Sequence, residues 1–290
     1  MGGVAFKDKV RRILKEEIPE TLQYVSSLTA IDKSYLSKNM LGSAGKSDTS
    51  GDIDLNMDER LYDKVGLLAV LKEKLGEDNV KDWTHVNQIF TCVPIKGDPA
   101  NGFIQIDFMF GDRAWQEFSY FSPGPKSKYK GLFRTELLKA AVAFNSDWVL
   151  KSGDDVIARV GPTFFHDRGC VWRYRHRPMR KDLTGRVKAF VELTEEEFLK
   201  LYPYAEPATQ SVVDTSQGVS DIIFGNGRHN YGHTAAFESY ETLKFAIKTR
   251  YNFIDYGIVM QIFHERLNSL KVDIPEDIEN EILAATGAIG

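Results

Sequence analysis

Two carboxylates spaced two residues apart, shortly after a glycine–serine pair, constrain this 290-residue chain more than any other feature. The pair is Gly42-Ser43, and the carboxylates are Asp52 and Asp54. Side chains alternate between faces along an extended strand, so Asp52 and Asp54 project on the same side. Two like charges held that close are unfavourable unless a cation lies between them. The pattern therefore predicts a phosphate-holding turn beside a divalent-metal site, a combination that suits the handling of a nucleoside triphosphate.

Two other glycine- or acid-rich motifs do not fit this stretch. A P-loop requires a glycine, four residues and then Gly-Lys-Ser/Thr. Residues 45–47 supply the second half, but Met40 occupies the position of the first glycine. An EF-hand loop that began at Asp52 would place Met57 where the sharp turn needs glycine. Both motifs are excluded because their backbone geometry requires glycine at those positions.

A third acid, Asp107, stands alone in an apolar stretch. Residues 103–110 read Phe-Ile-Gln-Ile-Asp-Phe-Met-Phe, and this richness in β-branched and aromatic residues predicts a buried strand. A lone carboxylate in such a strand is costly unless it is paired or coordinates a metal. The ordinary alternative is an acid that caps a turn or pairs with an arginine at the sheet edge. The neighbouring Asp-x-Asp pattern favours the metal.

These motifs together resemble the signature of the DNA polymerase β-like nucleotidyltransferase superfamily. Residues 41–43, Leu-Gly-Ser, are followed by a polar spacer and by Asp-Ile-Asp-Leu at 52–55. The pattern is most similar to the minimal and antibiotic-type members, whose motif ends in Ser-Asp-Ile-Asp-Leu. Here Gly51 replaces that serine and the spacer is slightly shorter, but neither departure touches a presumed ligand. The resemblance covers about residues 38–112.

The resemblance implies a metal-dependent enzyme that moves a nucleotide from a nucleoside triphosphate (NTP) to a hydroxyl and releases pyrophosphate. Two Mg²⁺ or Mn²⁺ ions, roughly 3.5 to 4 Å apart, would stabilise the attacking and leaving oxygens. Asp52 and Asp54 would bridge both ions, and Asp107 would bind the ion that activates the acceptor hydroxyl and would take up its proton. Gly42 and Ser43 would hold the β- and γ-phosphates at a helix N-terminus. By themselves, these two residues are equally typical of an ordinary turn with an N-cap serine.

The resemblance implies an α+β fold with a small mixed β-sheet nucleotidyltransferase core, and hydrophobic periodicity predicts a helical C-terminal domain after it. The spacing of apolar residues predicts helices at 5–27, 58–75 and 133–145, and strands at 52–55, 86–95, 102–110 and within 148–177. A capping box at Thr194 and Glu197 predicts a helix start. Further helices are expected at 208–223, 234–249, 252–269 and 275–286. We expect a catalytic domain over 1–147, a basic β-rich segment over 148–193 and a helical domain over 194–290.

Composition limits the class of protein. The apolar fraction of 42% supplies enough residues for a core, while no apolar run reaches the length of about 18 that a membrane span needs. The first residues are charged and amphipathic rather than typical of a signal peptide. With Cys92 and Cys170 as the two cysteines, a disulfide framework is not expected, which is consistent with a reducing cytoplasm. Sequence indicates neither the oligomeric state nor which NTP is used.

A lysine after the third carboxylate fits the same resemblance. Several branches of the superfamily place a lysine on a helix there to neutralise the triphosphate, and Lys139 is similar in placement. A lysine on a solvated helix face is an equally good interpretation. Lys126, Lys128 and Lys130 lie in a loop rich in proline and glycine and compete for the role.

The segment 168–188 is strongly basic in a chain whose net charge is −4. Arginines contact phosphates and aromatic rings stack on bases, so Trp172 and Tyr174 among these cations favour a groove for an RNA acceptor. An edge strand that pairs with acids elsewhere is the alternative, and so are arginines that hold the incoming triphosphate. The predicted acceptor-binding residues are Arg173, Arg175, Arg177 and Arg180.

Two groups of histidine and cysteine residues suggest other roles. His166, Cys170 and His176 could contribute to a zinc site, although no Cys-x₂-Cys or His-x₃-His pair anchors one. His229 lies in the glycine-rich loop 225–233, which suits either close approach to phosphate or an ordinary connection between helices.

The preferred function is nucleotidyl transfer to RNA, at a 3′ end or on tRNA. Transfer to a small molecule or to a protein hydroxyl, and synthesis of an oligonucleotide signal, are the enzymatic alternatives. A binding protein that has lost turnover is the alternative of a different class, and the presence of all three acids argues against it.

Overall fold

The computed structural model describes residues 4–83, 87–124, 127–153, 155–177, 190–208, 210–225 and 233–287. The described residues combine helices with several small, mostly antiparallel sheets, which confirms the predicted α+β class. The chain divides into two compact units, Met1–Gly131 and Leu132–Gly290, and each is described by itself.

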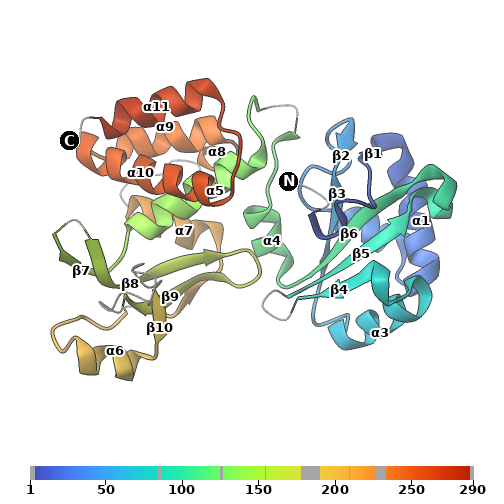
Figure 1. The fold of residues 1–290 in the computed structure, drawn as a ribbon, viewed down its shortest axis with the longest axis horizontal. Helices are drawn as coiled ribbons and strands as arrows, with labels where there is room; N and C mark the ends of the chain where they lie inside the picture. The colour runs from blue at the N-terminus through green and yellow to red at the C-terminus, as the bar shows by residue number, and fades with distance from the viewer. Residues whose placement is uncertain are drawn as a thin grey trace. The chain divides into compact units, whose positions relative to one another are not determined.

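The first unit contains a four-stranded mixed sheet, seen in Figure 1 with its strands labelled. The strands are β3 (Asp52–Met57), β4 (Val80–Asp82), β5 (Gln88–Pro94) and β6 (Phe103–Phe110), in the spatial order β3-β6-β5-β4. β3 runs parallel to β6, whereas the other neighbours are antiparallel. The predicted strands at 86–95 and 102–110 are therefore confirmed, each with slightly shorter bounds.

Helices cover one face of this sheet. Ile53, Leu55 and Met57 alternate with Asp52, Asp54 and Asn56 along β3, so the apolar side chains all point to the same face. There they join alternate residues of β6 and residues of helices α1 (Ile18–Thr29) and α3 (Lys64–Leu75) in one core cluster. Because the two strands are in register, their acids project from the opposite face, away from this helical layer.

The prediction of a continuous helix over 5–27 is wrong. This stretch forms the 3₁₀ turns η1 (Val4–Phe6) and η2 (Lys15–Glu17) and the short strand β1 (Ile13–Leu14), and the helix begins only at Ile18. Pro19 sets the first turn of α1, where a missing amide is tolerated. Tertiary contacts provide the alternative structure, since Val10 bridges Phe103 and β1 pairs with β2 (Thr49–Ser50). Apolar periodicity predicted the burial of Ile13 but assigned it to the wrong element, and the adjacent Leu14 is 41% exposed.

The remaining helices of the first unit are short. The helix predicted over 58–75 begins at Lys64, because the Asp63 carboxylate caps it by accepting from the amides of Val65 and Gly66. Sequence did not predict α2 (Lys33–Lys38) or α4 (Arg113–Ser119), which are capped by the side chains of Asp32 and Asp112. The short turns are η3 (Glu77–Asn79), η4 (Ile95–Gly97) and η5 (Pro99–Asn101).

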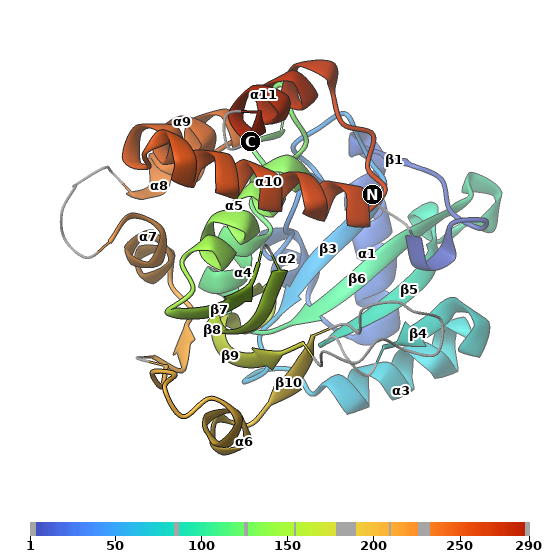
Figure 2. The same cartoon turned by 60° about the vertical axis from the view of Figure 1, so that its left-hand side comes forward.

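The second unit combines a curved antiparallel sheet with helices, as Figure 2 shows. Its strands are β7 (Trp148–Ser152), β8 (Asp155–Phe165), β9 (Gly169–His176), β10 (Val191–Leu193) and β11 (Val212–Val213). β9 lies at the centre and pairs with β8, β10 and β11. Ala158, Val160 and Tyr174 point to one face, where they pack with Phe198 in a small core.

The helices of the second unit largely follow the prediction. They are α5 (Gly131–Phe144), α6 (Glu195–Leu201), α7 (Ser216–Phe224), α8 (His233–Ala236), α9 (Tyr240–Arg250), α10 (Phe253–Ser269) and α11 (Glu276–Thr286). The capping box of Thr194 and Glu197 is present at the start of α6. The helix predicted over 208–223 begins only at Ser216, because Val212 and Val213 pair with β9 as a strand. The helix predicted over 234–249 is divided at Ser239, which caps α9.

Candidate functional site

The structure brings the three predicted carboxylates together. β3 and β6 are parallel neighbours in a register that places Asp54 directly beside Asp107, and Asp52 lies two residues earlier on the same face. One carboxylate oxygen from each of the three residues lies within 4.8 Å of the others. Within the described residues, this is the one group of three or more acid, histidine or cysteine side chains close enough to hold a metal ion.

The environment of these acids disfavours their charges. Asp107 is 6% exposed, and burial together with the nearby Asp52 carboxylate raises its pKa to about 8. Burial raises the pKa of Asp54 well above the usual range, and Asp52 and Asp107 add to the shift. Three carboxylates therefore share a site where their mutual repulsion is large without a cation. A divalent metal, whose preferred ligands are carboxylate oxygens, would remove that repulsion.

Gln105 orients the buried carboxylate. Its amide nitrogen donates to both oxygens of Asp107, at 2.8 and 3.1 Å, and this lowers the pKa of Asp107 against the larger effect of burial. The Gln105 carbonyl oxygen accepts in turn from the backbone N–H of Ala5, at 2.9 Å. Sequence analysis did not single out Gln105. Its position two residues before Asp107, on the same face of the strand, was the available signal.

Gly42 lies directly against Asp54. A Cβ atom added at this position would stand 2.8 Å from Asp54 Oδ2, and the backbone φ of +65° is in the left-handed region that favours glycine. The amide of Leu41 donates to the Asp54 carbonyl at 2.9 Å, which ties the turn to β3. The sequence does not indicate that Gly42 lies close to Asp54, but the structure places the glycine–serine turn against the acidic strand.

The turn itself differs from the predicted helix N-terminus. Residues 42–46 form successive turns, in which the Ser43 carbonyl accepts from the amides of Lys46 and Ser47 at 3.1 and 3.2 Å. The expected helix is absent, because Gly42 and Gly45 both have positive φ and reverse the chain direction. Ser43 Oγ lies 3.4 Å from Ser50 Oγ. Among the described residues, none accepts from the amides of Ser43, Ala44 or Gly45, so this turn offers donors to an anion.

Lys46 supplies a cation at the end of the same turn. Its ammonium group donates to the Ser122 carbonyl at 3.2 Å and lies 5.3 Å from the centre of the Phe121 ring. Burial lowers its pKa, whereas Glu117 opposes the shift. Sequence analysis considered Lys46 only as part of an incomplete P-loop.

Lys139 belongs to the second unit, on α5. Its ammonium group pairs with Glu136 at 2.9 Å, one turn earlier on the same helix. The side chain is 17% exposed, so the alternative of a lysine on a solvated face is not what the structure shows. Its assignment to the triphosphate stays a prediction. Of the competing loop lysines, Lys126 lies outside the described residues, and Lys128 stands 5.1 Å from the Tyr129 ring.

Two of the predicted acceptor-binding arginines, Arg173 and Arg175, share one face of β9 and contact the protein itself. Arg173 forms an ion pair with Glu192 of β10, and Arg175 donates to Thr163 Oγ1 at 2.7 Å. The guanidinium of Arg177, just after β9, lies 4.6 Å from the centre of the Phe190 ring. Arg180 lies outside the described residues. Arginines occupy alternate residues of β9, as expected for an edge strand that pairs with acids. However, β9 is the central strand of its sheet.

The weaker zinc hypothesis finds no support within the described residues, where His166, Cys170 and His176 do not gather into a metal-binding group. Burial raises the pKa of the Cys170 thiol to about 12, and His176 bonds through Nδ1 to the Tyr202 hydroxyl. His229 lies outside the described residues.

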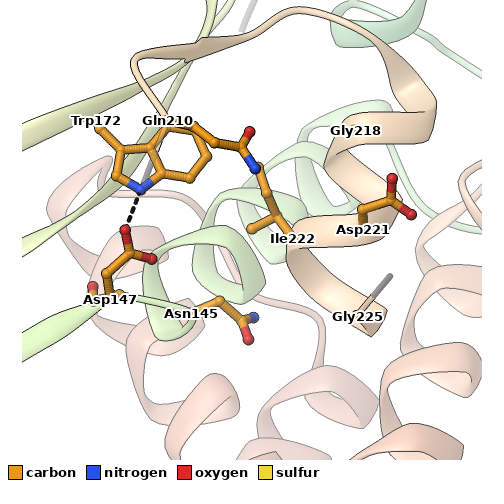
Figure 3. A pocket seen from close by; sticks show the side chains of 9 residues that line it. Asn145, Asp147, Trp172, Gln210, Gly218, Asp221, Ile222 and Gly225 are labelled. Carbon is orange, nitrogen blue, oxygen red and sulfur yellow. Dashed lines mark hydrogen bonds between the residues drawn. The ribbon is translucent and has the colours of Figure 1, made fainter. Parts of the chain in front are cut away.

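The second unit also contains a hollow of about 410 Å³ that sequence analysis missed, shown in Figure 3. The indole of Trp172 forms part of its wall, and its N–H donates to Asp147 at 2.7 Å. None of the predicted site residues lines it. Its lining residues are Asn145, Ser146, Asp147, Trp172, Gln210, Gly218, Asp221, Ile222 and Gly225.

Comparison with known proteins adds no relative. No protein-family model matches the chain, and a search of curated proteins finds no significant similarity. Among the helices that the structure describes, none has the length and apolar content needed to cross a membrane.

Proposed function

We propose that this protein is a metal-dependent nucleotidyltransferase of the DNA polymerase β-like type, which moves a nucleoside monophosphate from an NTP to a hydroxyl acceptor. The observation that carries the proposal is the convergence of Asp52, Asp54 and Asp107 on one face of a mixed sheet, with the Gly42 turn against them. The parallel pairing of β3 and β6 supports it, because it sets two separate sequence motifs side by side.

The donor set fits two divalent ions. Asp52 and Asp54 would bridge them, and Asp107 would hold the ion on the acceptor side. When bound, such ions stabilise charge on the attacking and leaving oxygens of an in-line displacement. The raised pKa values of Asp54 and Asp107 support this assignment, since a site that disfavours its own charges is relieved by a cation.

The remaining residues position the reactants. The unpaired amides of the 42–46 turn hold the β- and γ-phosphates of the NTP, and the Ser43 hydroxyl adds a donor. Lys46, at the end of that turn, balances part of the phosphate charge in the first unit. Gln105 holds the Asp107 carboxylate in one orientation, so that the oxygen that receives the acceptor proton is fixed.

RNA is the preferred acceptor, on the strength of the basic segment 168–188 with its interleaved aromatic residues. A small molecule or a protein hydroxyl is the alternative acceptor. The involvement of Arg173 and Arg175 in protein contacts favours this alternative, because it leaves fewer of their donors for a polynucleotide.

The test is transfer of label from each of the four α-labelled NTPs, in Mg²⁺ or Mn²⁺, to total RNA or to cell protein. The proposal predicts metal-dependent labelling of RNA that is lost in Asp52→Ala. Metal-dependent label on protein or on a small molecule would support nucleotidyl transfer but identify an acceptor other than RNA. No labelled product in any fraction, with either metal, would contradict nucleotidyl transfer itself.

A further inference from the structure

A cluster of cations lies within the second unit, which does not contain the three carboxylates. It consists of Arg134 and Lys139 on α5, Arg159 on β8, Arg175 on β9 and Arg266 on α10. β8 and β9 are paired so that Arg159 lies directly opposite Arg175, on the face of the sheet away from the Phe198 core. Figures 1 and 2 both show α5 and α10 beside this sheet. Four separate elements therefore direct positive charge into one region.

Contacts join Lys139 to Arg266, and electrostatic effects place Arg266 near Arg159 and Arg175. Arg266 binds Glu136 through Nε and Nη2, both at 2.8 Å, and Lys139 pairs with the other oxygen of Glu136 at 2.9 Å. Arg266 also lies near enough to Arg159 and Arg175 to lower the pKa of both guanidinium groups, although burial is the main cause. The cluster is thus continuous from the two helices to the β8–β9 hairpin.

Within the described residues, the acids that act on Lys139, Arg266 and Arg175 are each shared between two cations. Glu136 is 2% exposed and has both oxygens occupied by Lys139 and Arg266. The acid nearest to Arg175, Glu192, is bound by Arg173. The His166 ring adds no charge to the balance, because burial and the nearby Lys139 and Arg134 keep its pKa well below the usual range. Guanidinium groups stay protonated in proteins, so their repulsion is relieved by an anion and not by loss of a proton.

The depth of the cluster decides between a compact and an extended anion. Arg134 is 1% exposed, and the Lys139 side chain is 17% exposed. A polynucleotide binds through phosphates spread along an open surface. A partly buried group of cations from several elements suits an anion that carries several charges in a small volume, and the planar guanidinium matches phosphate oxygens in pairs.

We propose that the cationic cluster of the second unit binds an oligophosphate, meaning a chain of two or more linked phosphate groups, without requiring a divalent metal. The ligand is either a free inorganic oligophosphate or the phosphate tail of a nucleotide, since both present the same group. Binding here needs none of the three carboxylates.

Isothermal titration calorimetry of the full chain in EDTA tests this proposal, with tripolyphosphate, pyrophosphate and ATP as probes. Chelation removes divalent metals, so binding that depends on the carboxylate site is lost, and the arginine variants distinguish the cluster from the 42–46 turn. Arg159→Gln and Arg175→Gln should each weaken tripolyphosphate binding by at least about tenfold, which corresponds to one lost charge-assisted contact. The matched control is Arg168→Gln, because Arg168 lies in the same hairpin but is exposed and pairs with Asp167. This control should bind as the unchanged protein does.

Thermal denaturation without ligand shows whether each variant is folded. Removing one charge from a repelling group should leave the melting temperature of Arg159→Gln unchanged or higher, while the increase caused by tripolyphosphate is lost. ATP binding equal to tripolyphosphate identifies a nucleotide tail, and weaker ATP binding identifies a free oligophosphate. The proposal is overturned if both arginine variants bind tripolyphosphate normally, if sodium sulfate at equal ionic strength stabilises equally, or if a short RNA binds more tightly than tripolyphosphate.

The proposed transfer reaction can fail without affecting this result. Asp54→Asn should retain tripolyphosphate binding in EDTA even though it abolishes transfer. A loss of oligophosphate binding in Asp54→Asn would contradict the independence of the two sites.

Discussion

The two units of this protein each concentrate charge of one sign, and they differ in how that charge can be neutralised. The first gathers Asp52, Asp54 and Asp107, and burial raises the pKa values of Asp54 and Asp107, so that these two can bind protons. The second gathers arginines such as Arg159 and Arg175, which stay charged at any physiological pH. The acidic site can therefore be neutralised by protons or by metal, whereas the cationic cluster requires an anion. The same physical cost, repulsion of like charges in a partly buried place, leads to different ligands.

Loss of one carboxylate should have the largest effect. Asp54→Asn is expected to reduce nucleotidyl transfer by about a thousandfold or more, because the metals lose a shared ligand. Without metal, the same change should raise the melting temperature, since one repelling charge is gone. Transfer of label and differential scanning fluorimetry measure the two effects. Transfer that survives in Asp54→Asn would contradict the assigned centre.

The corresponding change in the second unit should lower stability instead. Glu136 is the buried partner of both Lys139 and Arg266, so Glu136→Gln leaves two cations without their acid. We expect a loss of about 3 to 5 kcal/mol in the free energy of unfolding, measured by urea denaturation. Glu279→Gln, which changes an exposed acid of α11, is the control and should lose far less. Tripolyphosphate should recover part of the stability of Glu136→Gln.

The acidic site should also respond to pH. The pKa of Asp107 is raised in the folded state, so folding takes up a proton between the ordinary aspartate range and about pH 8. In EDTA, stability should therefore fall as the pH rises through this window, by up to about 1.4 kcal/mol for each pH unit. Mg²⁺ should reduce this slope, and Asp107→Asn should remove much of it. Urea denaturation at several pH values, with and without Mg²⁺, measures it. If stability depends on pH equally with and without Mg²⁺, the metal does not bind these carboxylates.

The close approach of the glycine turn to the acids predicts a smaller effect. Gly42→Ala adds a Cβ atom 2.8 Å from Asp54 Oδ2 and strains a backbone at positive φ. We expect a loss of about 1 to 3 kcal/mol in stability and a reduced affinity for NTP. Gly76→Ala is the matched control, because Gly76 also has positive φ but no neighbour within 4 Å of the added atom. Equal losses of NTP affinity in both variants would show that Gly42 has no special relation to the site.

The smallest effect is expected at the rim of the cationic region. Arg173 is already paired with Glu192, and both are partly exposed. Arg173→Gln should change the free energy of unfolding by less than about 1 kcal/mol and leave tripolyphosphate binding in EDTA nearly unchanged. A tenfold loss of that binding would extend the cluster to Arg173.

Local sequence signals predicted some parts of this structure well and others poorly. Strand β6 followed from its β-branched and aromatic residues, and the start of α6 followed from the capping box of Thr194 and Glu197. The N-terminal segment was misassigned because Val10 and Ile13 are buried by strand partners distant in sequence. Apolar spacing reports which side chains are buried, but the burying partner decides the backbone conformation.

The candidate site shows the same division. The motifs identified Asp52, Asp54 and Asp107, because a carboxylate in an apolar strand is costly and an Asp-x-Asp spacing shares one face. They did not identify Gln105 or Lys46, whose contacts involve residues 2 and 76 positions away. Nor did the basic segment reveal Arg159 and Arg266 as neighbours of Arg175, since these residues come from different elements of the second unit.

The sequence by itself determined which residues carry the chemistry of the first unit and which face of each strand they occupy, because alternation along a strand is a local property. Only the tertiary structure decided that β3 lies parallel to β6 with Asp54 beside Asp107. Only it decided that Gly42 lies against Asp54, and that Lys139 and Arg266, from two helices, bind a single buried glutamate. Register, close approach and local charge balance depend on distances between remote segments, and these distances are set by packing.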